Sequence, residues 1–384
     1  MDNTAVRMQE RSRARSDLLA GKRPDRVLIF THFSGEAACG FAGVKLIEAH
    51  YRRELLEQAF DKICAYFYSD ANPIVYIRYP PVYQLLGSRN WLLASNGAVQ
   101  HPEISVMEPE DYDAFIAAPY KTIVERFIPR ACAALDGDPA NYGLNLAKAV
   151  TAWKDTQEWQ SRVFSRLNAK YGYTEDMSNH RLLAAPFDFL SDQLRGFKGI
   201  MMDMRRIPAK VEAAAEAILP LILDLAIPPA PREGLRSVVP LHLAPYISQK
   251  QFETLYWPSF ERMVLELDRR GIGCTLFAEH DWTRYADYLE RLPGSTAVYF
   301  ETADPARIAQ TVGKNHAFGG FYNPTITLAK SREACIDEAK RLLDTCMESG
   351  RFYFTFDSDV LDIKSIDPAK LAAVLEWIRD KGRY

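Results

Sequence analysis

Short apolar runs alternate with longer amphipathic stretches in the second half of the chain. The apolar runs are typical of buried strands, and the longer stretches have helical periodicity. The sequence predicts strands at 238–243, 274–278, 296–300, 317–321 and 352–356. Helices are predicted after them, at about 249–270, 285–292, 305–312, 331–348 and 368–380. Five successive strand-then-helix units predict parallel strands with helical crossovers, in either an open doubly wound sheet or a closed barrel.

The first half of the chain is less regular. Strands are predicted at 27–33 and 74–77, and helices at 44–68, 112–135, 144–169 and from Pro208 to about Leu219. Pro220 is expected to end or kink the last of these helices. The proline-rich stretch 227–232 joins the two halves, and we interpret it as a surface loop rather than a linker. We therefore predict one domain over 1–384, with helical elaborations in about 100–235.

Composition and charge exclude several classes of protein. The chain is 48% apolar and 25% charged, with a formal net charge of −3. These values do not fit a disordered chain or a polybasic nucleic-acid binder. The chain also lacks the excess of positive charge that would attract it to an anionic membrane. The six cysteines form no CxxC pair, the start of the chain lacks an apolar leader, and the longest apolar run, 217–227, is too short for a bilayer. We expect a soluble, cytoplasmic protein.

Familiar catalytic motifs are missing. There is no GxGxxG after a strand, no Walker GxxxxGK[ST], no GxSxG and no HExxH. Cys39 lies in a run of small residues after the first strand, which we interpret as a loop. A packed small side chain is the favoured reading of Cys39 over a reactive thiol.

Polar side chains follow nearly every predicted strand. They are Thr31, His32, His242, Glu279, His280, Asp281, Glu301, Tyr322, Asn323, Asp357, Ser358 and Asp359. Ligands of parallel α/β folds bind at the carboxyl ends of the strands, so converging strands would bring these groups into one pocket.

Each of these residues also has an ordinary structural explanation. Asp281 and Asp359 are equally compatible with helix capping, and His32 and His242 with hydrogen-bonded core positions. The run 279–281 is different, because three ionisable residues in a row are costly to bury without partners. Such a run favours a zinc-type site or an acid/base role. The aromatic residues beside the proposed pocket, Tyr246, Phe277, Trp282 and Tyr322, are more typical of core than of a ligand cage.

Four segments carry a resemblance to a known family. They are 18–27 (LLAGKRPDRV), 187–211 (FDFLSDQLRGFKGIMMDMRRIPAKV), 245–252 (PYISQKQF) and 366–371 (IDPAKL). Together they resemble the uroporphyrinogen decarboxylase superfamily, over about 10–384, by order and spacing more than by any single motif. The resemblance implies an α/β fold with a single TIM-type (β/α)8 barrel and extra N-terminal helices. It also implies a porphyrinogen decarboxylase or a cobalamin-dependent methyltransferase, such as an O-demethylase component.

Departures from the family pattern distinguish its branches. The decarboxylases have an Arg-rich motif after the first strand, whereas 30–38 (FTHFSGEAA) contains no Arg, which disfavours a substrate with many carboxylates. The thiol-methylating branch binds zinc through His-x-Cys and a late Cys. Those positions fall on 277–279 and near 357–359, where both cysteines are absent. The resemblance therefore implies zinc held by oxygen and nitrogen, from His242, Glu279, Asp357 and Asp359, similar to the Glu and His replacements of O-demethylase methyltransferases.

The leading hypothesis is a methyltransferase that moves a methyl group from a small methylated substrate, an aryl methyl ether, to the cob(I)alamin of a partner corrinoid protein. Glu279, His280 and Tyr322 are the predicted catalytic residues, with His280 or Tyr322 as proton donor to the leaving oxygen. Substrate contacts are predicted for His32, Tyr246, Trp282 and Asn323. A metal-free decarboxylase of a small acid and a non-catalytic small-molecule binding protein are the alternatives. A homodimer is left open.

Overall fold

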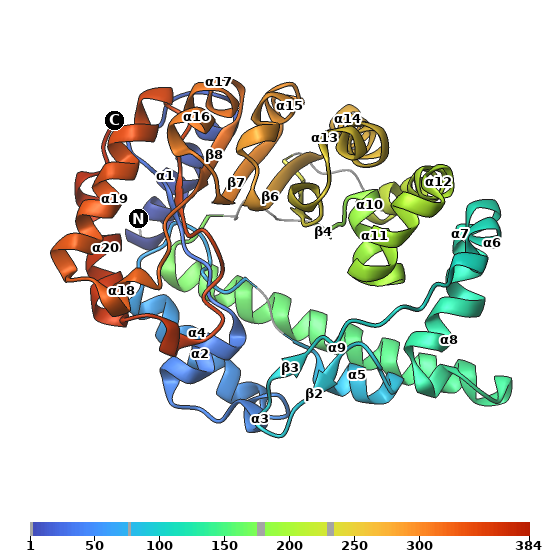
Figure 1. Cartoon of the computed structure of the whole chain (residues 1–384). Coiled ribbons are helices and arrows are strands. Elements are labelled where there is room, and N and C mark those ends of the chain that lie inside the picture. Colours follow the sequence, from blue (N-terminus) through green and yellow to red (C-terminus); the bar gives the residue numbers. More distant parts are fainter. Residues whose placement is uncertain (1–2, 76–77, 175–180, 229–233) are drawn as a thin grey trace. The chain divides into compact units, whose positions relative to one another are not determined.

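The computed structural model describes residues 3–75, 78–174, 181–228 and 234–384 (Figure 1). The chain divides into two units. The first unit is Met1–Arg78, Trp159–Asn179 and Gly273–Tyr384, and the second is Tyr79–Glu158 and His180–Ile272. Residues 76–77 of the predicted strand 74–77, and 229–232 of the predicted proline-rich loop, lie outside the described residues. The single-domain organisation stays a prediction.

The first unit contains a continuous row of parallel strands. Strands β6 (Gly273–Asp281), β7 (Ala297–Thr302) and β8 (Ala317–Gly320) are neighbours in that order. A parallel bridge joins Phe318 to Phe352, and β9 (Phe354–Thr355) pairs in parallel with β1 (Ile29–Phe30). The last strand of the chain thus lies beside the first. The predicted α/β class with parallel strands is confirmed, whereas the described strands form no closed ring.

Helices follow the strands of the first unit, as the sequence pattern predicts. They are α15 (Ala286–Glu290), α16 (Pro305–Gln310), α17 (Val312–Asn315), α18 (Ile326–Ala329), α19 (Arg332–Cys346) and α20 (Pro368–Lys381). Figure 1 shows α15, α16 and α17 beside the row of strands. The side chains of Asp304, Ser331 and Asp367 accept backbone N–H groups and so begin α16, α19 and α20. Four helices come from the N-terminal part, namely α1 (Asn3–Leu19), α2 (Gly35–Ala42), α3 (Leu46–Ala49) and α4 (Arg53–Tyr66).

The described part of the second unit is mostly helical. Its helices are α5 (Pro80–Leu86), α6 (Tyr112–Ala117), α7 (Pro119–Thr122), α8 (Ile128–Ala131), α10 (Pro186–Phe189), α11 (Gly196–Arg206), α12 (Pro208–Ala226), α13 (Gln249–Gln251) and α14 (Trp257–Arg269). Its strands are β2 (Leu92–Leu93) antiparallel to β3 (Val99–Gln100), and β4 (Arg181–Leu182) parallel to β5 (Arg236–Leu241). The long helix α9 (Pro139–Tyr171) contributes residues to both units.

Three local predictions need correction. Helix α12 continues past Pro220 to Ala226, because burial of Ile222, Leu223 and Ala226 offsets the one backbone hydrogen bond that proline removes. The predicted helix 44–68 is two helices, α3 and α4, interrupted at 50–52. The small residues around Cys39 form a helix, α2, rather than a loop, and the Ser34 side chain caps it. Cys39 is buried there and burial raises its thiol pKa to about 12, so the packed reading of Cys39 is confirmed.

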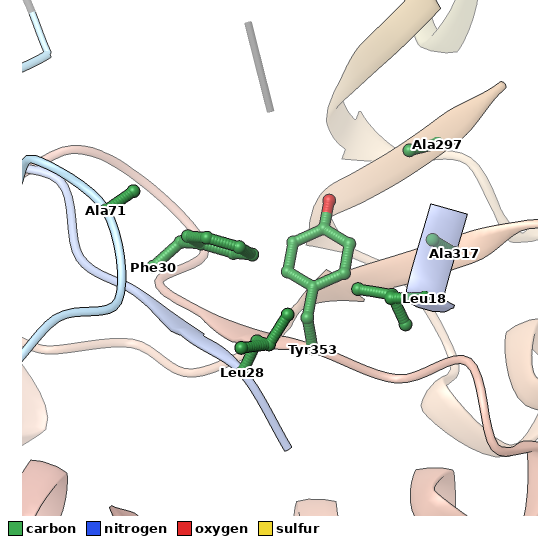
Figure 2. Packing of buried hydrophobic residues seen from close by; sticks show 7 residues of the cluster. All are labelled: Leu18, Leu28, Phe30, Ala71, Ala297, Ala317 and Tyr353. Atoms are coloured by element: carbon green, nitrogen blue, oxygen red, sulfur yellow. The ribbon is translucent and has the colours of Figure 1, made fainter. Parts of the chain in front are cut away.

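A buried apolar cluster packs against the row of parallel strands. It consists of Leu18, Leu28, Phe30, Ala71, Ala297, Ala317 and Tyr353 (Figure 2). The rings of Phe30 and Tyr353 meet edge to face at 5.5 Å. A Cβ at Gly319 would lie 2.5 Å from the Tyr353 carbonyl oxygen, so only glycine allows this approach. The cluster residues show which face of each strand points inward. Because side chains alternate along a strand, every second residue after a cluster residue points to that same face.

A buried ionic network holds β1 to the segment after α4. The Asp70 carboxylate is fully buried and accepts hydrogen bonds from Arg11 (3.0 Å), from both terminal nitrogens of Arg26 (2.7 Å each) and from the Ile29 N–H (2.8 Å). We expect Asp70→Ala to lower the free energy of unfolding by about 3–5 kcal/mol, because it leaves two guanidinium groups without their buried partner. Urea unfolding measures this loss. Asp17→Asn, in a partly exposed pair with Arg13 (3.8 Å), should cost less than about 1 kcal/mol. Equal effects of the two changes would contradict this account.

Candidate functional site

The inward face of β6 and β7 carries an aromatic pair. Side chains alternate along a strand, so Tyr299 and Glu301 share the face of Ala297, which belongs to the buried cluster. Phe277 lies opposite Tyr299 in the register, and the two rings stack at 4.4 Å with an angle of 6° between their planes. Both side chains are half-buried. The pair therefore offers a flat apolar surface just below the carboxyl ends of the strands.

A histidine and an aspartate from two other strand ends lie beside this pair. The His32 Nδ1 is 3.3 Å from the Asp359 carboxylate, and both side chains are partly exposed. The His32 ring also meets the Tyr299 ring edge to face at 5.7 Å. A carboxylate close to one ring nitrogen orients an imidazole. His32 and Asp359 thus form an acid/base pair next to the aromatic surface.

Beyond Ala278 the β6 strand bulges. The register with β7 shifts between Ala278 and Asp281, and His280 has a left-handed φ of 58°, which is unfavourable for a residue other than glycine. Glu301 holds this conformation, because its carboxylate accepts the His280 backbone N–H at 2.7 Å. The same carboxylate lies 3.8 Å from the His280 ring nitrogen Nδ1. Backbone strain of this kind is frequent at functional sites.

Asp357 supplies a carboxyl group that binds its proton unusually tightly. Its side chain is nearly buried, and the Ser358 hydroxyl donates a hydrogen bond to it at 3.0 Å. Burial raises the pKa of Asp357 to about 6, and the Glu301 carboxylate adds to the rise. A carboxyl group with this pKa is protonated in weakly acidic solution and can serve as a proton donor.

The structure corrects the role predicted for Tyr322. Its side chain is fully buried, and its hydroxyl donates to the Cys335 carbonyl of α19 at 3.3 Å. Burial raises the pKa of this phenol further above its ordinary value. The hydroxyl therefore lies against a helix and cannot protonate a substrate at the strand ends.

Three further predicted positions have structural roles in the first unit. The Asn323 carboxamide oxygen accepts from the Thr325 N–H at 2.8 Å and so makes a turn. The Asp281 carboxylate caps the next turn by accepting the Thr283 N–H at 2.9 Å, which agrees with the capping role that the sequence analysis gave as its structural explanation. Trp282 is fully buried and donates its indole N–H to the Glu279 carbonyl at 2.9 Å. Trp282 thus shapes the loop rather than facing a ligand, and we correct its predicted substrate contact; the substrate contact of the exposed Asn323 stays a prediction.

Two predicted residues belong to the second unit. Tyr246 is exposed and meets the Phe197 ring edge to face at 5.5 Å. The His242 Nδ1 lies 2.5 Å from the Asp192 carboxylate, a partner fifty residues away in the chain. Sequence reasoning placed Glu301 among the strand-end groups but left it out of the site. It placed Phe277 beside the pocket but favoured a core role for it, and it did not identify Tyr299. The period-two alternation starting at Ala297 was the signal that could have identified Tyr299 and Glu301.

The four predicted zinc ligands are divided between the two units. In the described ranges no group of three or more His, Cys, Asp or Glu side chains is placed to hold a metal ion. Of the four predicted ligands, His242 is in the second unit and Glu279, Asp357 and Asp359 are in the first. Zinc therefore stays a prediction, and we derive no chemical step through it.

Comparisons with known proteins agree with the α/β fold. A solved structure of a methyltransferase from Methanosarcina mazei superposes with a TM-score of 0.61 at 12% sequence identity, over 96% of this chain and 98% of that one. No curated protein matches the sequence. Within the described ranges, no helix is both long and apolar enough to cross a membrane. The family model for uroporphyrinogen decarboxylase (URO-D) matches residues 182–380, more than half of the chain, and the chain therefore belongs to this family.

Proposed function

We propose that the protein is a methyltransferase that moves a methyl group from an aryl methyl ether to the cob(I)alamin of a partner corrinoid protein. The observation that carries this proposal is the stacked Phe277–Tyr299 pair with acidic and imidazole groups at its edge. A planar aromatic ring can stack on this pair. The ether oxygen then meets groups that hold protons, as departure of a phenol requires.

A closed (β/α)8 barrel is part of this proposal. The pairing of the last strand, β9, with the first, β1, supports it, because an open doubly wound sheet does not bring its first and last strands together in this way. The likeness to the methyltransferase from Methanosarcina mazei supports the same reading. A cytoplasmic location and a homodimer stay predictions.

The residues of this chain would bind the ring and protonate the leaving oxygen. The partner's cob(I)alamin would supply the nucleophile that accepts the methyl group. As the methyl carbon–oxygen bond breaks, its electron pair stays on the phenol oxygen, which takes the proton of Asp357. His32, oriented by Asp359, would hydrogen-bond to a second oxygen on the ring and fix its orientation. Expulsion of a neutral phenol avoids a phenolate in a partly buried site.

The test combines the purified protein, 2-methoxyphenol and free cob(I)alamin under anaerobic conditions. We expect catechol and methylcobalamin in equal amounts, measured by chromatography and by visible absorbance. Phenol, which has no methyl group to give, is the matched control. Release of CO2 from 2-hydroxybenzoate without any methyl transfer would favour the decarboxylase alternative instead. Elemental analysis of protein purified without chelators tests the zinc prediction separately.

The rate should depend on pH through Asp357. The proton donor must be protonated, and burial raises the pKa of Asp357 to about 6. The rate of methyl transfer should therefore be nearly constant below about pH 5, fall to half near pH 6 and then fall by up to about tenfold per pH unit. Single-turnover rates between pH 5 and pH 8 measure this profile. A rate that rises through the same range would exclude Asp357 as the proton donor.

A further inference from the structure

A largely apolar cavity lies within the second unit, and all of its lining residues belong to that unit. Its volume is about 440 Å³, within the usual range for small-molecule sites. The walls come mainly from Phe127, Phe189, Ile222, Leu225 and Pro240. These walls disfavour an anionic ligand, because its charge would lose its hydration against apolar side chains and would face the Asp192 carboxylate.

One wall of this cavity carries an imidazole held by a carboxylate. His242 and Asp192 both line the cavity, and the His242 Nδ1 lies 2.5 Å from the Asp192 carboxylate. Both side chains are only partly exposed, at 38% and 26%. The carboxylate on Nδ1 sets the tautomer and the orientation of the ring, so His242 would act on a ligand through Nε2.

A buried aspartate holds the backbone of this histidine in place. The Asp188 carboxylate accepts the N–H groups of His242 (3.1 Å) and Leu243 (3.0 Å) and the Tyr256 hydroxyl (2.7 Å). Burial raises the pKa of Asp188 to about 7, although these donors oppose the rise. Asp188 is a positioning residue, because it fixes the end of β5 from which His242 projects.

The helices around the cavity are locally distorted. Two π-helical segments, Ile123–Phe127 and Leu190–Arg195, both contribute lining residues. Such segments widen a helix by one residue per turn and are frequent at functional sites. Here the second segment supplies Asp192, the partner of His242. The cavity is thus lined by an imidazole–carboxylate pair and by two π-helical segments, and the buried Asp188 carboxylate holds the backbone of His242.

We propose that this cavity binds a small uncharged phenol, with its ring among the apolar side chains and its hydroxyl on His242 Nε2. Phe127 and Phe189 suit an aromatic ring, and the apolar walls suit a neutral molecule. A hydroxyl can donate to a neutral imidazole or accept from a protonated one, whereas an ether oxygen can only accept. The site binds the phenol and no bond changes there. This binding is independent of the methyltransferase proposal, because it uses no residue of the first unit and no corrinoid.

Isothermal titration of the full chain with 4-methylphenol, without corrinoid or methyl donor, tests the proposal. We expect a saturable site whose heat of binding is absent from the cavity-filling variant Ala131→Trp, which separates this cavity from the first-unit site proposed for aryl methyl ethers. At this cavity the methyl ether of the ligand, 4-methylanisole, should bind at least about tenfold more weakly, because it cannot donate a hydrogen bond. Tighter binding of 4-methylbenzylamine than of 4-methylphenol would show a cation site at Asp192 and overturn the proposal.

Variants locate the binding. His242→Ala should weaken 4-methylphenol binding at least about tenfold, and Ala131→Trp, which fills the cavity, should remove it. His101→Ala is the matched control, since His101 lines the neighbouring cavity that His242 also borders, and it should leave the affinity within about twofold. Circular dichroism checks that each variant is folded. Unchanged binding by His242→Ala, or equal losses in the His242 and His101 variants, would overturn the proposal.

Discussion

Replacing Asp357 by asparagine should lower the rate of methyl transfer by at least about 10²-fold while making the fold more stable at neutral pH. The rate falls because the amide has no acidic proton to give to the leaving oxygen. Its shape and its contact with the Ser358 hydroxyl are otherwise similar. Single-turnover transfer from 2-methoxyphenol to cob(I)alamin measures the loss.

The stability gain follows from the raised pKa of Asp357. The carboxyl binds its proton more tightly in the folded protein, with a pKa of about 6, than in the unfolded chain, where the ordinary value is 3.8. Ionised Asp357 therefore destabilises the fold at pH values well above 6, by up to about 3 kcal/mol, and this cost vanishes below pH 4. Asp357→Asn removes the charge. We expect it to raise the free energy of unfolding by about 1–3 kcal/mol at pH 8 and to leave it nearly unchanged at pH 4.

Urea unfolding at the two pH values measures this difference. Asp344→Asn, on the exposed face of α19, is the matched control and should change neither the rate nor the stability. A simultaneous loss of rate and gain of stability is the mark of a group kept for function at the expense of the fold. If Asp357→Asn instead loses stability at pH 8, Asp357 is a structural residue.

The strands and helices that surround the first-unit site could be predicted because their signals are local. The apolar run 296–300 gave β7 within one or two residues, and Pro305 and Pro368 follow the aspartates that cap α16 and α20. Helix α1 was missed. Its exposed, strongly charged sequence gives little periodic signal, and Leu18 packs on residues far away in the chain.

The orientation of side chains at the strand ends could not be predicted from the alternation of residues along each strand. Alternation holds only while a strand stays regular, and β6 bulges after Ala278 while Phe321 follows β8 with a left-handed φ of 71°. The shift at Phe321 turns the next residue, Tyr322, toward α19 rather than toward a ligand. The pairing of His242 with Asp192 has no local signal either, because it depends on tertiary packing across fifty residues.

Glu279→Gln should lower the rate of methyl transfer by at least about 10²-fold and leave the free energy of unfolding within about 1 kcal/mol. Glu279 is half-buried and lies two residues after Phe277, whose ring stacks on Tyr299. Its backbone carbonyl accepts the Trp282 indole N–H, which anchors this part of the bulge. Glutamine keeps that backbone bond and nearly the same volume, so the substitution isolates the charge.

The expected loss of rate has an electrostatic cause. We expect the Glu279 carboxylate to stabilise positive charge that develops on the transferring methyl carbon, whereas a neutral amide does not. Removing one positioned charged group of this kind costs about 10²–10³ in rate. Glu348→Gln, on an exposed turn after α19, is the matched control and should retain the full rate. If Glu279→Gln transfers methyl groups as fast as this control, Glu279 shapes only the bulge. The reacting atoms would then lie nearer to Asp357 and His32 than to the end of β6.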